Sequence, residues 1–520
     1  MLIHTRALLL SGLALGALTA AAPAQAFTFT AGDLVVSSST YTGTASTVTV
    51  GQTTPGSGTK TAVADGTFPT VFNNSTIDGS FGVSSPLFLN QYNIGGTEAA
   101  PTISANGVYN VTAATGVATS FASKSEGALN LSPDGHTLSF VDYYTAPNVL
   151  DVSNSNTPGI VEPGNYTANP TARTVVNLDN NANAQVLQTN AYPGNNGRAA
   201  IDVNGTIYLA GNSGNASGSA AVTGAGGIQS FTPASATTTA GAYNTTRVES
   251  YNITQNGYAA DKTAKDNNFR GLTVFNNTLY TTKGSGGNGI DTVYQVGTAG
   301  TLPGSTNTAI NILPGFPTGL ATTNTAGFYP FGLFFANATT LYVADEGSGS
   351  AADYGTSKTN GGLSKWSLVG GVWVEDYVLS TGLNVGLSYA VCPVGTTTCT
   401  ASTSAPTTTN YTAATDGLRN ITGVVNADGT VTIYGITSTT SLSGDQGADP
   451  NELVAITDSL ANTSSTVAST ESFTTLQTAA YGQVLRGVSF APVPEPASMT
   501  VFGLGTAVLG FVRRRRNNKR

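Results

Sequence analysis

The feature that most constrains this chain is a hairpin that recurs along it. A short apolar strand, a tight turn and an alternating second strand follow one another in five places. The turns use Asp-Gly, Asn-Gly or Asn-Asn pairs, or a nearby Asn, residues that tolerate the backbone angles of tight turns. The predicted strand pairs are 128–131 with 137–141, 199–203 with 206–210, 271–275 with 278–282, 332–335 with 340–344, and 421–425 with 430–434. This repeat predicts an all-β chain built from serial sheets.

The spacing of the repeat predicts a β-propeller. Third strands follow Gly/Ser-rich loops at 227–231, 292–296, 362–366 and 451–456. The residues that open the inner strands, at 126, 198, 270, 331, 419 and 486, lie about 72 residues apart on average. Sheets of three or four strands at this spacing are typical of propeller blades. We expect six blades, or seven if the joined blade takes a long insertion.

The two ends of the repeat region are complementary. Residues 486–490 are typical of an inner strand, yet no hairpin follows them. Residues 33–36 and 86–92 are typical of later strands, yet no inner strand precedes them. We therefore predict that N- and C-terminal strands pair in one shared blade and close the ring, which removes exposed sheet edges.

Residues 1–26 have the pattern of a secretory signal peptide. Arg6 supplies the positive start, an Ala/Leu-rich apolar stretch follows, and Ala24 and Ala26 form a small-x-small cleavage site. The alternative is a buried N-terminal helix. A signal peptide implies export, and in an oxidising compartment Cys392 and Cys399 are predicted to form a disulfide. The alternative for this pair is a metal or redox site.

The other end carries a more specific pattern. Val493 precedes Pro494, Glu495 and Pro496, then come a mostly apolar run at 497–512 and a basic tail at 513–520. These three parts resemble the PEP-CTERM sorting signal of Gram-negative bacteria. The resemblance implies export, transient anchoring in the inner membrane through a short transmembrane helix at 497–512, and processing by an exosortase. Release to the cell surface or extracellular matrix would follow. The predicted domains are thus a signal peptide at 1–26, a propeller at 27–492 and a sorting segment at 493–520.

Charge excludes nucleic acid as a partner. The body at 27–492 holds 13 basic and 27 acidic residues, a net charge of about −14. Such a surface repels nucleic acid and anionic membranes. The basic tail could bind nucleic acid, but an exported protein meets little of it.

The scarce arginines of the body share one structural position. Four of its six arginines, and one glutamate, open predicted inner strands: Glu126, Arg198, Arg270, Arg419 and Arg486. In a propeller these positions lie on one face around the channel mouth, with acidic residues of the second-to-third-strand loops nearby. One hypothesis is a ring of guanidinium groups that binds an anionic or polyhydroxyl ligand. The other is a lattice of arginines and acids that fastens neighbouring blades.

Other candidate chemistry is sparse. His136 directly follows a Pro-Asp-Gly turn, where we expect a solvated turn residue, so no Ser-His-Asp triad is predicted. Asp445, Asp449 and Glu452 concentrate oxygen ligands that could hold calcium, although the EF-hand spacing is missing. The alternative is a solvated acidic loop.

The function predicted from these features is a non-enzymatic, exported propeller at the cell surface or in the extracellular matrix. Its partner would be a polysaccharide or an envelope protein. The segment 125–135 resembles the inner hairpin of secreted propellers of the lactonase or esterase-like kind. That resemblance implies an alternative function, a hydrolase with its site at the channel mouth. A redox propeller with quinone or haem is not favoured, because the sequence has no Cys-x-x-Cys-His.

Overall fold

A computed structural model describes the body of the protein between residues 27 and 495. It leaves out the stretches 42–61, 65–71, 75–82, 122, 124–125, 150–170, 194, 214–223, 234–242, 261–264, 285, 305, 325–326, 354, 357–360, 392–410, 441–448 and 481, together with both ends. Among these omitted residues are Cys392, Cys399, Asp445, Pro496, both predicted cleavage-site alanines and the predicted membrane span at 497–512. In the part of the chain that is described, no helix is long and apolar enough to cross a membrane.

All five predicted hairpins are present. Their turns hold the conformations that the sequence suggests: Asn204 and Gly205 have φ values of 53° and 81°, and Asn276 and Asn277 have 45° and 55°. Positive φ at both central residues matches the right-handed twist of the flanking strands. The hairpins are β7 (Asn130–Leu131) with β8 (Leu138–Tyr144), β11 (Gly197–Val203) with β12 (Thr206–Gly211), β15 (Leu272–Phe275) with β16 (Thr278–Lys283), β19 (Pro330–Asn337) with β20 (Thr340–Asp345), and β24 (Tyr411–Val425) with β25 (Thr430–Thr440).

Four sheets stand as discrete blades in a propeller-like arrangement. Three have four strands each, in the orders β11-β12-β13-β14, β15-β16-β17-β18 and β19-β20-β21-β22, and one has five, β23-β24-β25-β26-β27. Every pairing in them is antiparallel. The added strands are β13 (Gly227–Phe231), β14 (Thr246–Arg247), β17 (Thr292–Val296), β18 (Ile310–Ile312), β21 (Gly362–Val369), β22 (Val372–Leu379), β23 (Ser388–Val391), β26 (Glu452–Ser459) and β27 (Thr474–Thr478).

The predicted count of six blades is wrong, and so is seven. The rest of the repeat region forms one nine-stranded sheet, ordered β10-β9-β8-β6-β4-β1-β28, with β5 on β4 and β7 on β8. The physical reason is β6, which pairs with both β4 and β8 and so joins strands that the repeat assigns to two blades. The new strands are β1 (Leu34–Thr40), β4 (Ser84–Thr97), β5 (Ala100–Asn110), β6 (Val117–Ser120), β9 (Arg173–Leu178), β10 (Ala184–Thr189) and β28 (Gln483–Phe490).

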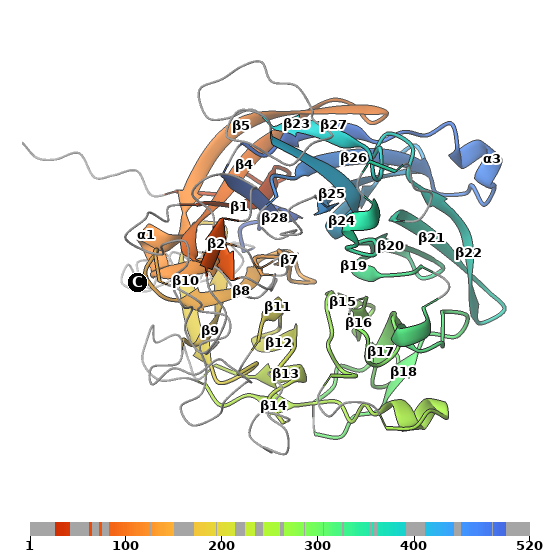
Figure 1. The fold of residues 1–520 in the computed structure, drawn as a ribbon, viewed down its shortest axis with the longest axis horizontal. Coiled ribbons are helices and arrows are strands. Elements are labelled where there is room, and N and C mark those ends of the chain that lie inside the picture. The colour runs from red at the N-terminus through yellow and green to blue at the C-terminus, as the bar shows by residue number, and fades with distance from the viewer. Residues whose placement is uncertain are drawn as a thin grey trace, which may run out of the picture.

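The predicted pairing of the chain's two ends is confirmed. β28 pairs with β1 along its whole length, from Leu34 opposite Phe490 to Thr40 opposite Gln483. The other edge of β1 pairs with β4. The last strand of the body therefore lies next to the first and forms the edge of the nine-stranded sheet nearest the axis (Figure 1).

The sheets follow one another around a common axis (Figure 1). The strands nearest the axis are β7, β11, β15, β19, β24 and β28. Apolar side chains fill the layers between neighbouring sheets, as where Phe275 stacks on Phe335 at 4.8 Å between ring centroids. The remaining elements are small: the strand pair β2 (Ala62–Ala64) and β3 (Phe72–Asn74), the α-helices α1 (Val111–Thr115) and α3 (Ser465–Ala468), and the 3-10 helices η1 (Ile253–Asn256), η2 (Ala321–Thr323) and η3 (Ala351–Asp353).

Candidate functional site

The residues predicted to form a ring lie near the axis at one end of the inner strands, which we call the ring face. Arg198, Arg270 and Arg486 each follow the connection that returns from an outer strand, so the antiparallel topology brings them to the same end. Glu126 lies just before β7, and Arg419 lies within β24. All are buried, with exposed fractions of 2% to 7%: Glu126, Arg198, Arg270, Arg419 and Arg486. Charged groups so deeply buried need internal partners.

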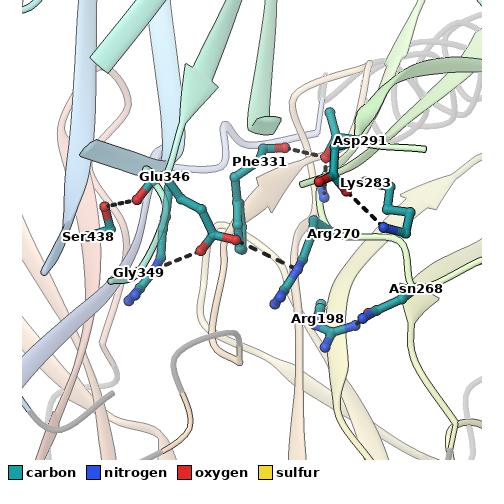
Figure 2. A network of polar contacts seen from close by, with 12 residues as sticks. Arg198, Asn268, Arg270, Lys283, Asp291, Phe331, Glu346, Gly349 and Ser438 are labelled. Carbon is teal, nitrogen blue, oxygen red and sulfur yellow. Dashed lines mark hydrogen bonds and ion pairs between the residues drawn. The ribbon is translucent and has the colours of Figure 1, made fainter. Parts of the chain in front are cut away.

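Glu346 is shared by two of the arginines. Its carboxylate lies 3.8 Å from Nε of Arg270 and 3.4 Å from Nε of Arg419. Figure 2 shows this carboxylate directed toward Arg270. The backbone of Glu346 is also held, because its carbonyl accepts a hydrogen bond from the Ser438 hydroxyl at 2.6 Å. One carboxylate from the β20–β21 connection thus links Arg270, just before β15, to Arg419, within β24.

Arg486 is bound by neutral groups of the protein. Its guanidinium donates to the Ser39 hydroxyl at 2.8 Å and to the carbonyl oxygens of Ser120, Phe121 and Ser123 at 3.3, 2.8 and 2.5 Å. Burial lowers the pKa of this arginine, while the nearby carboxylates of the site oppose that shift. These contacts fix the loop before β7 onto β28.

Glu126 takes its hydrogen bonds from hydroxyl groups. The side chains of Ser123 and Tyr143 both donate to its carboxylate. The amide of Asn196, just before β11, donates to the same Ser123 hydroxyl. Burial raises the pKa of Tyr143 well above its usual value, and the adjacent Glu126 charge raises it further. Glu126 is therefore the acceptor of a small hydroxyl network.

Arg198 has fewer hydrogen-bond partners than Arg486. It donates to the side chain of Asn268 and, at 3.3 Å, to the carbonyl oxygen of Phe269. Its Nε has no hydrogen-bond partner among the residues described. Burial lowers the pKa of this guanidinium well below its usual value, and the positive charge of Arg270 lowers it further.

Asp142 is a buried acid that, like Arg198, has few internal partners. It lies at the end of β8 with 1% of its surface exposed. Neither carboxylate oxygen accepts a hydrogen bond of normal geometry from the described residues. Burial raises its pKa well above the usual value and the Glu126 charge adds to this, while Arg486 opposes the shift. Asp142 and Arg198 are thus the two groups of the site that internal contacts satisfy least.

One ion pair beside the site was not predicted. Lys283 ends β16, Asp291 precedes β17, and their side chains meet at 2.8 Å (Figure 2). Both are almost fully buried. The signal was present in the sequence, because a lysine and an aspartate flank one loop between adjacent strands.

The predicted calcium ligands are only partly described. Asp449 is buried, and Glu452 accepts a hydrogen bond from the Thr478 hydroxyl at 3.0 Å. Burial raises the pKa of Glu452. Within the described ranges, no group of three or more His, Cys, Asp and Glu side chains is arranged to hold a metal ion. Asp445 lies outside those ranges, as do Cys392 and Cys399, so the calcium site and the disulfide stay predictions.

The C-terminal segment is in contact with the body up to the sorting motif. Pro492 is buried, Val493 is half-buried, and Pro494 and Glu495 are exposed. The expectation that His136 is solvated is wrong: it is half-buried, and its Nδ1 donates to the carbonyl oxygen of Val493 at 2.9 Å. The turn that carries it is thus a docking point for the C-terminal segment.

Comparisons with known proteins bear on the two parts of the chain differently. No curated protein matches the chain. A solved structure described as a quinonprotein alcohol dehydrogenase-like protein from Bacteroides thetaiotaomicron is 8% identical, covers 81% of this chain and 87% of that chain, and has a TM-score of 0.26. Residues 492–516 match the PEP-CTERM protein-sorting motif, so the predicted sorting signal of an exported, exosortase-processed protein is confirmed.

Proposed function

We propose that the protein is a non-enzymatic propeller that exosortase processing delivers to the cell surface or extracellular matrix. There it binds a polysaccharide or another envelope protein. Two features support the proposal. The sorting motif indicates export, and the charged residues near the axis pair with other groups of the protein.

The observation that carries the proposal is that three of the ring arginines already bind groups of the protein itself. Arg486 is occupied by a hydroxyl and three carbonyl oxygens, and Glu346 lies between Arg270 and Arg419. A ligand that bound these groups would have to displace contacts within a buried network, leaving some of its charges unpaired. This supports the lattice that fastens neighbouring sheets over the ligand-binding ring.

The partner follows from the surface that remains. The mature body is acidic overall and rich in Thr, Ser and Asn. Hydroxyl and amide side chains can exchange hydrogen bonds with the hydroxyl groups of a neutral polysaccharide. The test measures whether the purified mature protein is retained on the extracellular polysaccharide of the bacterium that produces it, with bovine serum albumin as the control. Retention no greater than that of albumin would contradict the polysaccharide as partner.

A second candidate, a hydrolase, is favoured by Asp142 and Arg198. Asp142 is a buried acid with a raised pKa beside the Arg486 guanidinium, and Arg198 is a buried guanidinium whose Nε has no hydrogen-bond partner among the described residues. Such groups are used for acid–base chemistry. We would screen the mature protein with generic ester, lactone and phosphoester substrates, with and without calcium. Turnover that Asp142→Asn abolishes, at unchanged melting temperature, would replace the first proposal with the second.

Calcium at Asp445, Asp449 and Glu452 remains part of the proposal. Carboxylate and amide oxygens suit this ion. Calorimetric titration of the demetallated protein is the direct test. We expect heat that saturates below millimolar calcium and disappears in Asp449→Asn; no heat at millimolar calcium would end the idea.

A further inference from the structure

Both ends of the mature chain are fastened at one place on the body. The side-chain amide of Asn180, in the turn between β9 and β10, donates to the carbonyl oxygen of Phe29 at 2.7 Å and to that of Pro492 at 2.9 Å. The backbone of Asn180 also accepts from the Phe29 amide at 2.8 Å. Asn180 is buried, so water does not compete for these bonds. We call this arrangement the terminal clamp.

Further contacts hold the C-terminal segment down to the edge of the motif. The Ala491 amide donates to the Asp33 carbonyl at 2.9 Å, and the Val493 amide donates to the Gly135 carbonyl at 2.9 Å. His136 donates to Val493, as described above. Exposure begins at Pro494, the first residue of the Pro-Glu-Pro motif. The motif therefore leaves a rigid surface without an intervening linker.

The clamp lies at the end of the molecule opposite the ring face. β28 runs from the region of Arg486 at the ring face toward Phe490, and residues 491–493 continue beyond it. In an antiparallel meander, the turns between first and second and between third and fourth strands share one end. The turns that hold Gly135 and Asn180 are of these two kinds. We call this end the hairpin-turn face.

The distance available to a membrane-bound partner is short. Four peptide units separate Val493 from position 497, where the predicted membrane span starts, and they extend to at most about 14 Å. While the clamp is closed, the hairpin-turn face must lie close to the membrane surface and to any enzyme acting on the motif. The ring face must point away from the membrane.

The charge of the hairpin-turn face indicates whether a lipid or a protein contacts it. Glu98, Asp134, Asp179, Asp202 and Asp428 lie in or next to its turns. The turns 97–100, 132–137, 179–183, 202–205, 276–277, 337–339 and 426–429 contain no lysine or arginine. An acidic face is repelled by anionic headgroups and attracted to a basic protein surface.

We infer that the hairpin-turn face is the surface on which the anchored precursor meets its processing enzyme. The enzyme presents a basic surface to this acidic face, and the terminal clamp sets that orientation. This inference rests on the proposed processing by an exosortase and adds which face of the body the enzyme contacts.

Photo-cross-linking in the full-length precursor, produced together with an exosortase, tests the orientation. A photoreactive residue is placed at the exposed positions Pro133 or Asn181 on the hairpin-turn face, or at the exposed Thr381 on the opposite side. We expect cross-links to the enzyme from the first two positions at least fivefold above those from Thr381. Equal yields from both faces, or cross-links to lipid alone, would overturn the inference. If the precursor is never processed, the proposed processing is contradicted as well. If it is processed normally but cross-links from Thr381, only the inferred contact face is contradicted.

A second measurement tests the clamp without any enzyme. In purified full-length protein, Asn180→Asp removes the donor amide while keeping the size of the side chain. We expect amide hydrogen exchange at Ala491 and Val493 to become about tenfold faster, since their local structure opens more often. Asn181→Ala, in the same turn but exposed, should leave both rates unchanged. Unchanged exchange in Asn180→Asp would show that the clamp does not hold the segment.

Discussion

Single buried charges explain how the ring face is held together. Glu346 serves two arginines from different sheets, while Arg486 uses carbonyl oxygens and a hydroxyl. A buried ion pair is not in itself strongly stabilising, but removing one partner leaves the other charged in an apolar setting. The dependence of stability on Glu346 should therefore be large.

We predict that Glu346→Gln lowers the free energy of unfolding by about 3 kcal/mol, because two buried guanidinium groups lose their shared counter-charge. Urea unfolding measures the change. The control is Glu375→Gln on the exposed side of β22, which should change the value by less than about 0.5 kcal/mol. Equal effects of the two substitutions would show that the lattice contributes nothing.

Asp345 should make stability depend on pH. It accepts hydrogen bonds from the amides of Tyr329 and Gly347, yet burial raises its pKa to about 7 from 3.8. The folded protein therefore binds a proton more tightly than the unfolded chain. This contribution to stability is complete below about pH 4 and is lost as pH rises through 7.

The expected result is a wild-type stability that falls, relative to Asp345→Asn, by about 4 kcal/mol between pH 4 and pH 8. The measurement is urea unfolding of both proteins across that range. Since the asparagine has no such titration, parallel pH profiles of the two proteins would contradict the raised pKa.

At the scale of elements, small residues let the inner strands approach one another. A Cβ at Gly271 would lie 1.9 Å from the Phe331 carbonyl oxygen, and one at Gly332 would lie 2.5 Å from that of Arg419. Each glycine directly follows a residue that opens an inner strand. The same positions thus combine a residue near the axis with a close backbone contact between neighbouring sheets.

Gly271→Ala should therefore destabilise the protein by about 2–3 kcal/mol, because the added methyl group collides with backbone that cannot move aside. Gly319→Ala is the matched control, since nothing lies within 4 Å of a Cβ there. Thermal unfolding followed by circular dichroism compares the two. A melting temperature of Gly271→Ala equal to that of the control would mean that β15 and β19 are not closely packed.

At the scale of the whole molecule, closure depends on the last strand. β28 pairs with β1, and Asn451 and Asn420 connect it to the sheet of β24 and β25. Without β28, β1 would lose its hydrogen-bonded partner and become the edge strand of the nine-stranded sheet, and the contacts with the neighbouring sheet would be lost.

We predict that a chain ending at residue 482 loses cooperative unfolding, whereas a chain ending at residue 495 keeps the melting temperature of the full protein. The second chain keeps all of the contacts that the described C-terminal residues make with the body. Differential scanning calorimetry distinguishes the two results. A sharp transition in the shorter chain would show that ring closure is dispensable.

The sequence alone determined the local structure and the sorting signal. Asn-Gly and Asp-Gly turns between alternating strands define hairpins because the turn angles and the side-chain period are local properties. The match between 486–490 and 33–36 indicated closure for a related reason: each half of a sheet lacks what the other supplies. The Pro-Glu-Pro motif with its apolar and basic stretches indicated sorting, because a short linear segment carries that signal.

Tertiary structure alone decided how strands group and how charges pair. β6 pairs with both β4 and β8, and this merges two expected blades into one sheet. No local pattern at 117–120 indicates that this segment pairs with two strands. The sequence predicted that the arginines cluster near the axis, but only packing pairs Glu346 with two of them and Arg486 with carbonyl oxygens. Likewise, Asn180 is one polar turn residue among many until folding brings Phe29 and Pro492 to it. Contacts between residues hundreds of positions apart depend on the arrangement of whole sheets, and no local spacing encodes them.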